Sequence, residues 1–230
     1  MKTKIKFSLI FLSVIVFTLC SCSSAYVPTS VEVPIFKEKG EVNASIQTGT
    51  CGIIDPHLSV SLTDHVALMF NGSYGNSSSD SSDNYHYHLT GEFGIGYYEN
   101  FGSVGFCQFF AGYGISQVKS NFDFWDNDGI ADNSTNAYMQ KLFIQPSVGI
   151  TYPFIDLAFT PRMTYLHIDV NEVIRDDVFF EPVLTLKMGS PNFKLTGQGG
   201  FSIPMEVIDY DYRFFIFNVG CSIMLGRNSD

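Results

Sequence analysis

The stretch YHYHLTGEFGIGY, from Tyr85 to Tyr97, alternates between two kinds of side chain at every step. Its odd positions are aromatic or aliphatic, apart from Gly91, and its even positions are polar or glycine. Because a β-strand turns successive side chains to opposite faces, this period of two predicts a strand with one apolar and one polar face. From Glu41 onward the period of two dominates, and no stretch sustains the helical period of 3.6.

The same alternation recurs along the chain and defines about ten strands. They are expected at 41–50, 53–63, 65–75, 85–99, 103–118, 137–152, 154–170, 178–189, 191–204 and 210–225. The connections after the second, fourth, sixth and eighth strands are tight, and those after the third, fifth, seventh and ninth are longer. Short turns at one end and longer loops at the other are typical of outer-membrane barrels. We therefore predict an all-β fold, an antiparallel up-and-down β-barrel of about ten strands of the outer-membrane type.

Alternation alone does not decide which face of the strands points inward, because soluble and membrane barrels place their apolar faces on opposite sides. Tyrosines gather near the strand ends, as in the aromatic girdles of membrane barrels. The polar face bears charges of both signs at mid-strand. Such charges can pair inside a lumen, whereas a basic residue facing lipid costs about 2–4 kcal/mol. The expected polar network of the lumen comprises Glu92, Lys141, Asp156, Arg162, Glu181 and Lys187.

The first 22 residues have the features of a lipoprotein export signal. A basic start is followed by an apolar run that ends at Leu19 and is too short for a confident membrane-spanning helix. Leu19-Cys20-Ser21-Cys22 places an aliphatic residue three positions before Cys22 and a small residue directly before it, as a bacterial lipobox does. We expect residues 1–21 to be a removed signal peptide and Cys22 to be acylated. An ordinary secretory signal with incidental cysteines is the alternative.

The expected domain organisation follows from this signal. Residues 22–40 contain two prolines and no periodicity, and they are predicted to be a lipidated tether leading to a barrel at 41–226, with a polar tail at 227–230. The anchor is expected on the periplasmic side, because no acidic run follows Cys22 as it does in lipoprotein surface-export signals. Cys51, Cys107 and Cys221 are too few and too widely spaced for a disulfide framework or a metal site.

Three features together resemble the small outer-membrane β-barrel lipoproteins of Bacteroidetes. They are the lipobox, the Glu38-Lys39-Gly40-Glu41 entry into the first strand, and Thr63-Asp64-His65-Val66-Ala67 continuing to Tyr74. The resemblance covers most of residues 22–225. It implies a barrel in the outer membrane of a Gram-negative bacterium and brings no catalytic residues with it. The chain departs from the usual pattern at its end, where Ile223-Met224-Leu225-Gly226 and a polar tail replace a terminal aromatic residue.

Composition and motifs narrow the function. With 13 basic and 23 acidic residues the net charge is −10, too acidic for nucleic-acid binding. The sequence contains no nucleophile elbow or phosphate-binding loop, so neither an enzyme nor a cofactor is expected. Phe110, Phe143 and Phe179 fall on the inward face of the predicted strands, and their large rings predict a nearly filled lumen. We expect a non-enzymatic outer-membrane lipoprotein, in contact with outer-membrane lipid, whose outer loops serve envelope structure or bind an unidentified protein or glycan at the surface.

One acidic loop suggests a metal ion. Asp126-Asn127-Asp128-Gly129-Ile130-Ala131-Asp132 resembles the calcium-binding repeats of thrombospondin type 3, with Asp126, Asp128 and Asp132 as candidate ligands. Alternating oxygen ligands around a glycine turn suit calcium, which takes six to eight oxygens. A solvated acidic loop is the alternative. Trp125 beside it is expected to be a rim anchor or a contact for a partner.

Two further functions stay open at this point. A lipid-tethered soluble periplasmic barrel would bind a small apolar ligand in its interior. A rim protease would resemble the omptins, ten-stranded barrels with an Asp/His site across opposed outer loops, although His167-Ile168-Asp169 reverses their carboxylate-then-imidazole order. The candidate rim residues are Asp80, Asp83, His86, His88, His167, Asp169, Asp209 and Asp211.

Overall fold

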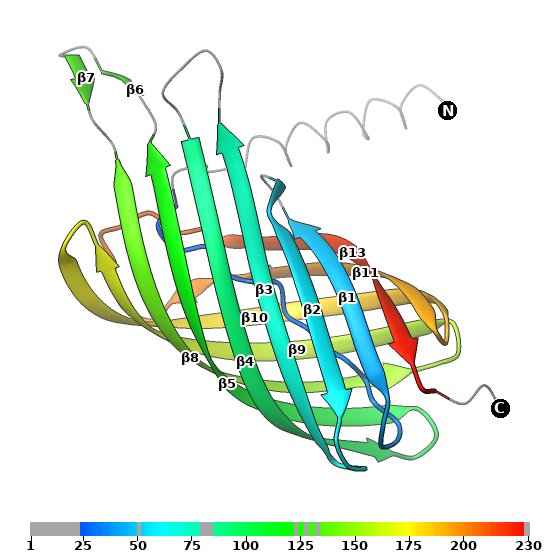
Figure 1. Ribbon diagram of the computed structural model, residues 1–230. Coiled ribbons are helices and arrows are strands. Elements are labelled where there is room, and N and C mark those ends of the chain that lie inside the picture. Colours follow the sequence, from blue (N-terminus) through cyan, green and yellow to red (C-terminus); the bar gives the residue numbers. More distant parts are fainter. Residues whose placement is uncertain are drawn as a thin grey trace, which may run out of the picture.

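The computed structural model describes residues 24–49, 52–78, 85–121, 124–126, 129–131 and 134–227, with only the backbone given for 124–126 and 129–131. The described chain is mostly β-structure (Figure 1). Its strands are β1 (Val42–Gly49), β2 (Ile54–Ser61), β3 (Val66–Ser78), β4 (Tyr85–Phe101), β5 (Gly105–Asn121), β6 (Phe124–Asp126), β7 (Gly129–Ala131), β8 (Thr135–Thr151), β9 (Ile155–Val170), β10 (Val173–Ser190), β11 (Phe193–Phe201), β12 (Ile203–Pro204) and β13 (Phe215–Leu225). Within these ranges no helix is long and apolar enough to cross a bilayer.

Ten strands form a closed antiparallel barrel, in which each strand pairs with the next in the order β1-β2-β3-β4-β5-β8-β9-β10-β11-β13. The barrel closes where β13 pairs with β1, in a register that aligns Val42 with Leu225 and Gly49 with Asn218. The short β12 follows β11 and also pairs with β10, and β6 and β7 form a separate hairpin between β5 and β8. The predicted all-β barrel of about ten strands is confirmed.

The two ends of the barrel differ in their connections. At one end, here called the turn end, residues 62–65, 102–104, 152–154 and 191–192 link the strands tightly, as predicted. The opposite end, here called the loop end, holds the connections 50–53, 79–84, 122–134, 171–172 and 205–214. The connection predicted over 171–177 is shorter, because Asn171 and Glu172 form a two-residue turn with φ of 50° and 70°. Two positive φ values suit a hairpin turn that continues the strand twist, so β10 begins at Val173.

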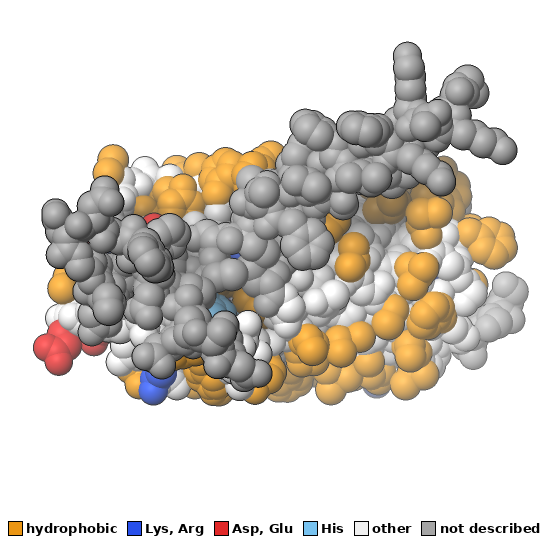
Figure 2. Space-filling model, turned by 90° about the horizontal axis from the view of Figure 1, so that it is seen from above, with side chains coloured by type: hydrophobic (Ala, Val, Ile, Leu, Met, Phe, Trp, Pro, Cys, Tyr) orange, Lys and Arg blue, Asp and Glu red, His pale blue; other side chains and the backbone are white. Residues whose placement is uncertain are grey.

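The apolar faces of the strands point outward. On β9, the outward Leu157 and Phe159 are 40% and 45% exposed, whereas the inward Asp156 and Arg162 are 4% and 1% exposed. Many apolar side chains accordingly lie on the part of the outer wall that is visible in Figure 2. A polar interior with an apolar exterior is the arrangement of a membrane-spanning barrel. It disagrees with the alternative of a soluble barrel that binds an apolar ligand inside, since that function needs an apolar cavity.

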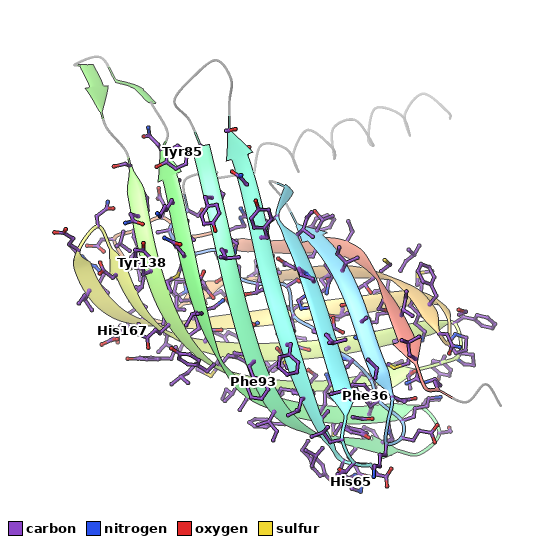
Figure 3. The ribbon with its side chains drawn as sticks, viewed as in Figure 1. Phe36, His65, Tyr85, Phe93, Tyr138 and His167 are labelled. Atoms are coloured by element: carbon purple, nitrogen blue, oxygen red, sulfur yellow. The ribbon has the colours of Figure 1, made fainter. Side chains whose placement is uncertain are left out.

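The apolar band on the outer wall has the height of a bilayer core. From Ile155 to Tyr165 on β9 the chain advances ten residues, which is roughly 33 Å along the strand and roughly 25 Å after a tilt of about 40°. Exposed Tyr152 and Phe154 lie at the turn-end border of this band, and Tyr165 lies at its loop-end border. Aromatic side chains at both borders fit the two membrane interfaces. In Figure 3, Tyr138 and His167 lie toward the loop end and His65 lies at the turn end.

Three inward phenylalanine side chains lie over glycines of the neighbouring strand. The three register pairs are Phe110 with Gly96, Phe143 with Gly112, and Phe106 with Gly149. A Cβ atom at Gly96 would lie 2.3 Å from the Phe110 ring, too close for any real side chain. Glycine therefore makes room for the buried rings, which narrow the lumen as the sequence predicted.

Candidate functional site

The lumen is occupied by the chain's own residues 24–36, here called the lumen segment. All of them are buried except the half-buried Pro28. The segment runs from the loop end to the turn end, where the chain reverses at Gly40, with φ of +88°, and enters β1 (Figure 1). The sequence predicted a tether leading to the barrel over residues 22–40. The described part of that region is irregular, as expected, but it lies within the barrel, because the wall supplies partners for its backbone and side chains.

The local sequence explains why the lumen segment stays extended. Pro28 and Pro34 disfavour a helix and remove two backbone N–H groups that would otherwise need partners inside the barrel. Several of the remaining polar backbone groups are bonded to side chains of the wall. The Val31 N–H donates to the Gln198 side chain (3.2 Å), and the Gln145 amide donates to the Glu32 carbonyl (2.7 Å). An extended chain inside a polar lumen is thus hydrogen-bonded without belonging to any sheet.

Side chains of the lumen segment match two kinds of surface on the wall. One is an apolar cluster in which Val31, Val33 and Ile35 pack with inward side chains of four strands, namely Phe106, Ala158, Val183 and Ile216. The other is polar: the Ser30 N–H donates to Asp55 (2.9 Å), and the Ser30 hydroxyl lies 2.7 Å from Nε2 of His57. The apolar side chains on the wall would face an aqueous channel if the lumen segment were absent.

Glu32 is the charged residue that the lumen segment contributes. Its carboxylate accepts hydrogen bonds from Asn43 (2.8 Å) and Ser45 on β1, and it lies 3.3 Å from Nζ of Lys187 on β10. Nζ of Lys187 also donates to the Val33 carbonyl (2.6 Å). Both charged side chains are at most 5% exposed. Because a buried charge without its partner is strongly destabilising, Lys187 of the wall depends on Glu32.

A second ionic cluster lies nearer the loop end. Oε1 of Glu92 is 2.7 Å from Nζ of Lys141 and 2.9 Å from a terminal nitrogen of Arg162, and Nε of Arg162 is 3.7 Å from Glu181. The Thr29 hydroxyl of the lumen segment donates to Glu92 (2.8 Å) and accepts from Lys141 (3.0 Å). These side chains come from β4, β8, β9 and β10, so the cluster spans the lumen and holds the segment at its centre.

Of the six residues predicted to form a lumen network, the structure brings four together: Glu92, Lys141, Arg162 and Glu181. Lys187 instead pairs with Glu32, and Asp156 pairs with Lys194 (2.6 Å). The sequence analysis missed Glu32 and Thr29, because the lumen segment has no period of two long enough to indicate a strand. A lone carboxylate within the apolar run Val31-Glu32-Val33 was the available signal.

Residues 205–214 cover the lumen segment at the loop end. The Ala25 N–H donates to the Asp211 carbonyl (2.8 Å), and the Arg213 N–H donates to the Tyr26 carbonyl (3.0 Å). The Tyr26 ring packs on Phe179 at 4.5 Å between centroids, and its hydroxyl donates to Glu181 (2.7 Å). The connection predicted as an outer loop over 205–209 is therefore part of a longer segment packed against the lumen contents.

Tyr210 joins this covering segment to the wall. Its hydroxyl donates to Asp177 (2.7 Å), at the loop end of β10. Burial, together with this hydrogen bond to a carboxylate, raises the pKa of the Tyr210 phenol. The phenol therefore stays protonated, and remains a donor, throughout the physiological pH range.

The lumen segment is also held at the turn end. The Arg227 guanidinium donates to Glu41 (2.7 Å) and to the Ile35 carbonyl (2.7 Å). The Phe36 ring packs against Tyr98 at 5.5 Å between centroids, inside the barrel (Figure 3). A pocket of about 20 Å³ between Pro34, Ile35 and the wall has room for about one water.

Several predicted site residues cannot be placed. Cys22, Asp80, Asp83, Asp128 and Asp132 lie outside the described residues, and Asp126 is described only by its backbone in β6. The acylation and calcium hypotheses therefore stay predictions. Among residues whose side chains are described, no cluster of three or more His, Cys, Asp or Glu could hold a metal ion.

The described rim residues do not converge on one site. His86 and His88 are buried on the inward face of β4 and stack at 6.5 Å between centroids. His167 faces outward on β9, where its Nδ1 lies 2.7 Å from Asp176. Asp209 is bonded to Arg175 on the outside of the molecule. The described histidines therefore lie on opposite sides of the wall and do not share one site. The omptin-like hypothesis also involves Asp80 and Asp83, which lie outside the described residues, and it stays a prediction.

No family model and no curated protein matches the chain. Two solved structures are similar in fold. The translocator domain of the autotransporter NalP from Neisseria meningitidis is 10% identical with a TM-score of 0.48, over 80% of this chain and 85% of that chain. An outer-membrane channel from Pseudomonas putida F1 is 13% identical with a TM-score of 0.41, over 84% of this chain and 99% of that chain.

At these identities and scores the two likenesses support no functional argument. The class of protein follows from the structure itself: a ten-stranded, membrane-spanning β-barrel of the outer-membrane type, with an apolar outer wall and a polar lumen. The lumen is filled by residues 24–36 of the same chain.

Proposed function

We propose that this protein is an outer-membrane β-barrel lipoprotein of a Gram-negative bacterium that acts as a sealed, non-enzymatic surface scaffold. Its loop end faces the exterior, as in other barrels with short periplasmic turns, and its loops serve envelope structure or contact with a protein or glycan partner. Acylation of Cys22 would add a lipid anchor to the attachment that the apolar barrel wall itself provides in the membrane.

The observation that supports a sealed scaffold is the match between the lumen segment and the wall. The segment contributes the carboxylate that pairs with Lys187 and the apolar side chains that cover Val183 and Ile216. In a conducting barrel, water hydrates the polar groups of the lumen wall. Here Asp55, His57 and Lys187 of the wall are bonded to the lumen segment instead. The buried carboxylates Glu92 and Glu181 are held in ion pairs and hydrogen bonds, which leaves them unsuited to acid–base catalysis.

Conductance across a planar bilayer tests this function. Purified wild-type protein should insert without stepwise ion conductance. A variant in which residues 25–36 are replaced by a Gly/Ser sequence of equal length should conduct, because the linker cannot replace the contacts with the wall. A matched control with the same replacement at residues 79–84, a loop-end connection, should remain silent. Stable conductance by wild-type protein would overturn the proposal of a sealed barrel.

A further inference from the structure

The path of the lumen segment determines where the preceding residues lie. Ala25 is bonded to Asp211 and Tyr26 forms a parallel bridge with Tyr212, both in the 205–214 connection of the loop end. At its other extremity, Ile35 is bonded to Arg227 and Gly40 to Ser61, at the turn end. The chain therefore enters the barrel at the loop end and crosses the whole lumen before β1 begins.

Two consequences concern the two ends of the described chain. Ser24 lies at the loop end, whereas β13 ends at Leu225 beside Val42, at the turn end. In an up-and-down barrel with an even number of strands, a chain that began directly at β1 would have both termini at the turn end. The lumen segment moves the N-terminal side of this chain to the opposite face.

The reach of an extended chain then limits the position of Cys22. Each residue spans at most about 3.6 Å, so the two steps from Ser24 place the Cα of Cys22 within about 7 Å of it. The apolar wall is roughly 25 Å high, by the strand arithmetic given for β9. The lumen is filled by residues 24–36, which leaves no route back through the barrel. Two residues cannot return to the turn end by any path.

We infer that Cys22, the predicted acylation site, lies at the loop end, so that its acyl chains enter the outer leaflet at the cell surface. This inference rests on the proposed function, which places the loop end outside. It differs from the sequence-based expectation of a periplasmic anchor, which followed from the absence of an acidic run after Cys22. The lipidated segment thereby reaches the cell surface through the lumen of its own barrel.

The partner implied by this geometry is a lipid leaflet. A single acyl chain binds a membrane only marginally, and stable anchoring takes a second signal. Here the barrel wall supplies the second hold, and an acyl group at the loop end would tie Ser24 and the covering connection 205–214 to the bilayer surface. A periplasmic anchor would instead require the lumen segment to leave the barrel.

Three epitope tags on full-length protein in cells test the inference. One tag is inserted between Ser23 and Ser24, which leaves the lipobox intact; one is inserted in the 79–84 connection; and one follows Asp230. Antibody binding is compared before and after outer-membrane permeabilisation, and palmitate labelling reports acylation of each tagged chain. We expect the first two tags to bind fully on intact cells and the third only after permeabilisation.

The outcomes separate the inference from the proposed function. If the tag at Ser24 behaves like the tag after Asp230, while the 79–84 tag is exposed, the path through the lumen is wrong and the inference falls. If the 79–84 tag needs permeabilisation and the tag after Asp230 does not, the proposed orientation falls and the surface position of Cys22 falls with it. Palmitate label that is retained after Cys22→Ala would overturn Cys22 as the acylated residue.

Discussion

The outward and inward faces of the ten barrel strands share one backbone but are matched to different surroundings. The outward face meets lipid, a uniform solvent, and needs only apolar side chains with aromatic residues at the two borders. The inward face meets residues 24–36, a particular sequence, and each polar group on it needs a particular partner. The effect of a substitution on the outer wall should therefore depend on its depth in the bilayer. The effect of a substitution in the lumen should depend on which interaction partner is lost.

The largest effect is expected from breaking the pair between lumen segment and wall. Glu32→Gln keeps the shape of the side chain but leaves Lys187 charged and buried without a counter-ion. We expect a loss of about 3–5 kcal/mol in the free energy of unfolding, measured by denaturant titration in detergent micelles. Lys187→Met added to Glu32→Gln should restore most of the loss, because it removes the unpaired charge. A Glu32→Gln variant as stable as the wild type would show that the segment does not hold this position.

A smaller effect is expected from a charge placed on the outer wall. Phe159→Lys puts an ammonium group in the middle of the apolar band and should cost about 2–4 kcal/mol in the free energy of unfolding in lipid. His167→Lys lies on the same face of β9, eight residues nearer the loop end, and should cost about 0–1 kcal/mol. Equal costs at the two positions would mean that the outer wall does not face a bilayer.

The smallest effect concerns the acidic loop beyond the barrel. If Asp126, Asp128 and Asp132 bind calcium, coordination should replace the repulsion between carboxylates and order the β6–β7 connection. The fluorescence of Trp125, the one tryptophan in the sequence, should then shift on titration with calcium. Asp128→Asn should abolish that shift. A flat titration at millimolar calcium would favour a solvated loop.

The same contrast explains how much could be predicted from the sequence. The barrel wall was predictable because a period of two identifies the side chains that share a face. The charges at Glu92 and Arg162 then indicate that the polar face points into the lumen. The turn-end connections were predictable because glycine, proline or aspartate marks each of them. The loop-end extent of β10 was not, since Asn171-Glu172 adopts a hairpin turn with a residue that rarely takes positive φ.

The contents of the lumen could not be predicted in the same way. Residues 24–36 form no sheet, so no periodicity identifies their neighbours, and the contacts of Glu32 with Asn43 and Lys187 join positions 11 and 155 residues apart. Prolines at 28 and 34 are equally compatible with a tether in water and with an extended chain in a lumen. Only the closed barrel shows that the wall has polar and apolar groups for this segment to satisfy.

Hydrogen exchange of residues 25–36 in the folded, lipid-embedded protein tests the central claim most directly. In the structure these residues are buried, apart from the half-buried Pro28, and the N–H groups of Ala25, Ser30 and Val31 have hydrogen-bond acceptors. Peptides covering this region should therefore exchange as slowly as peptides from the barrel strands, over minutes to hours. Exchange that is complete within seconds, as expected for a solvated tether, would contradict a lumen filled by this segment.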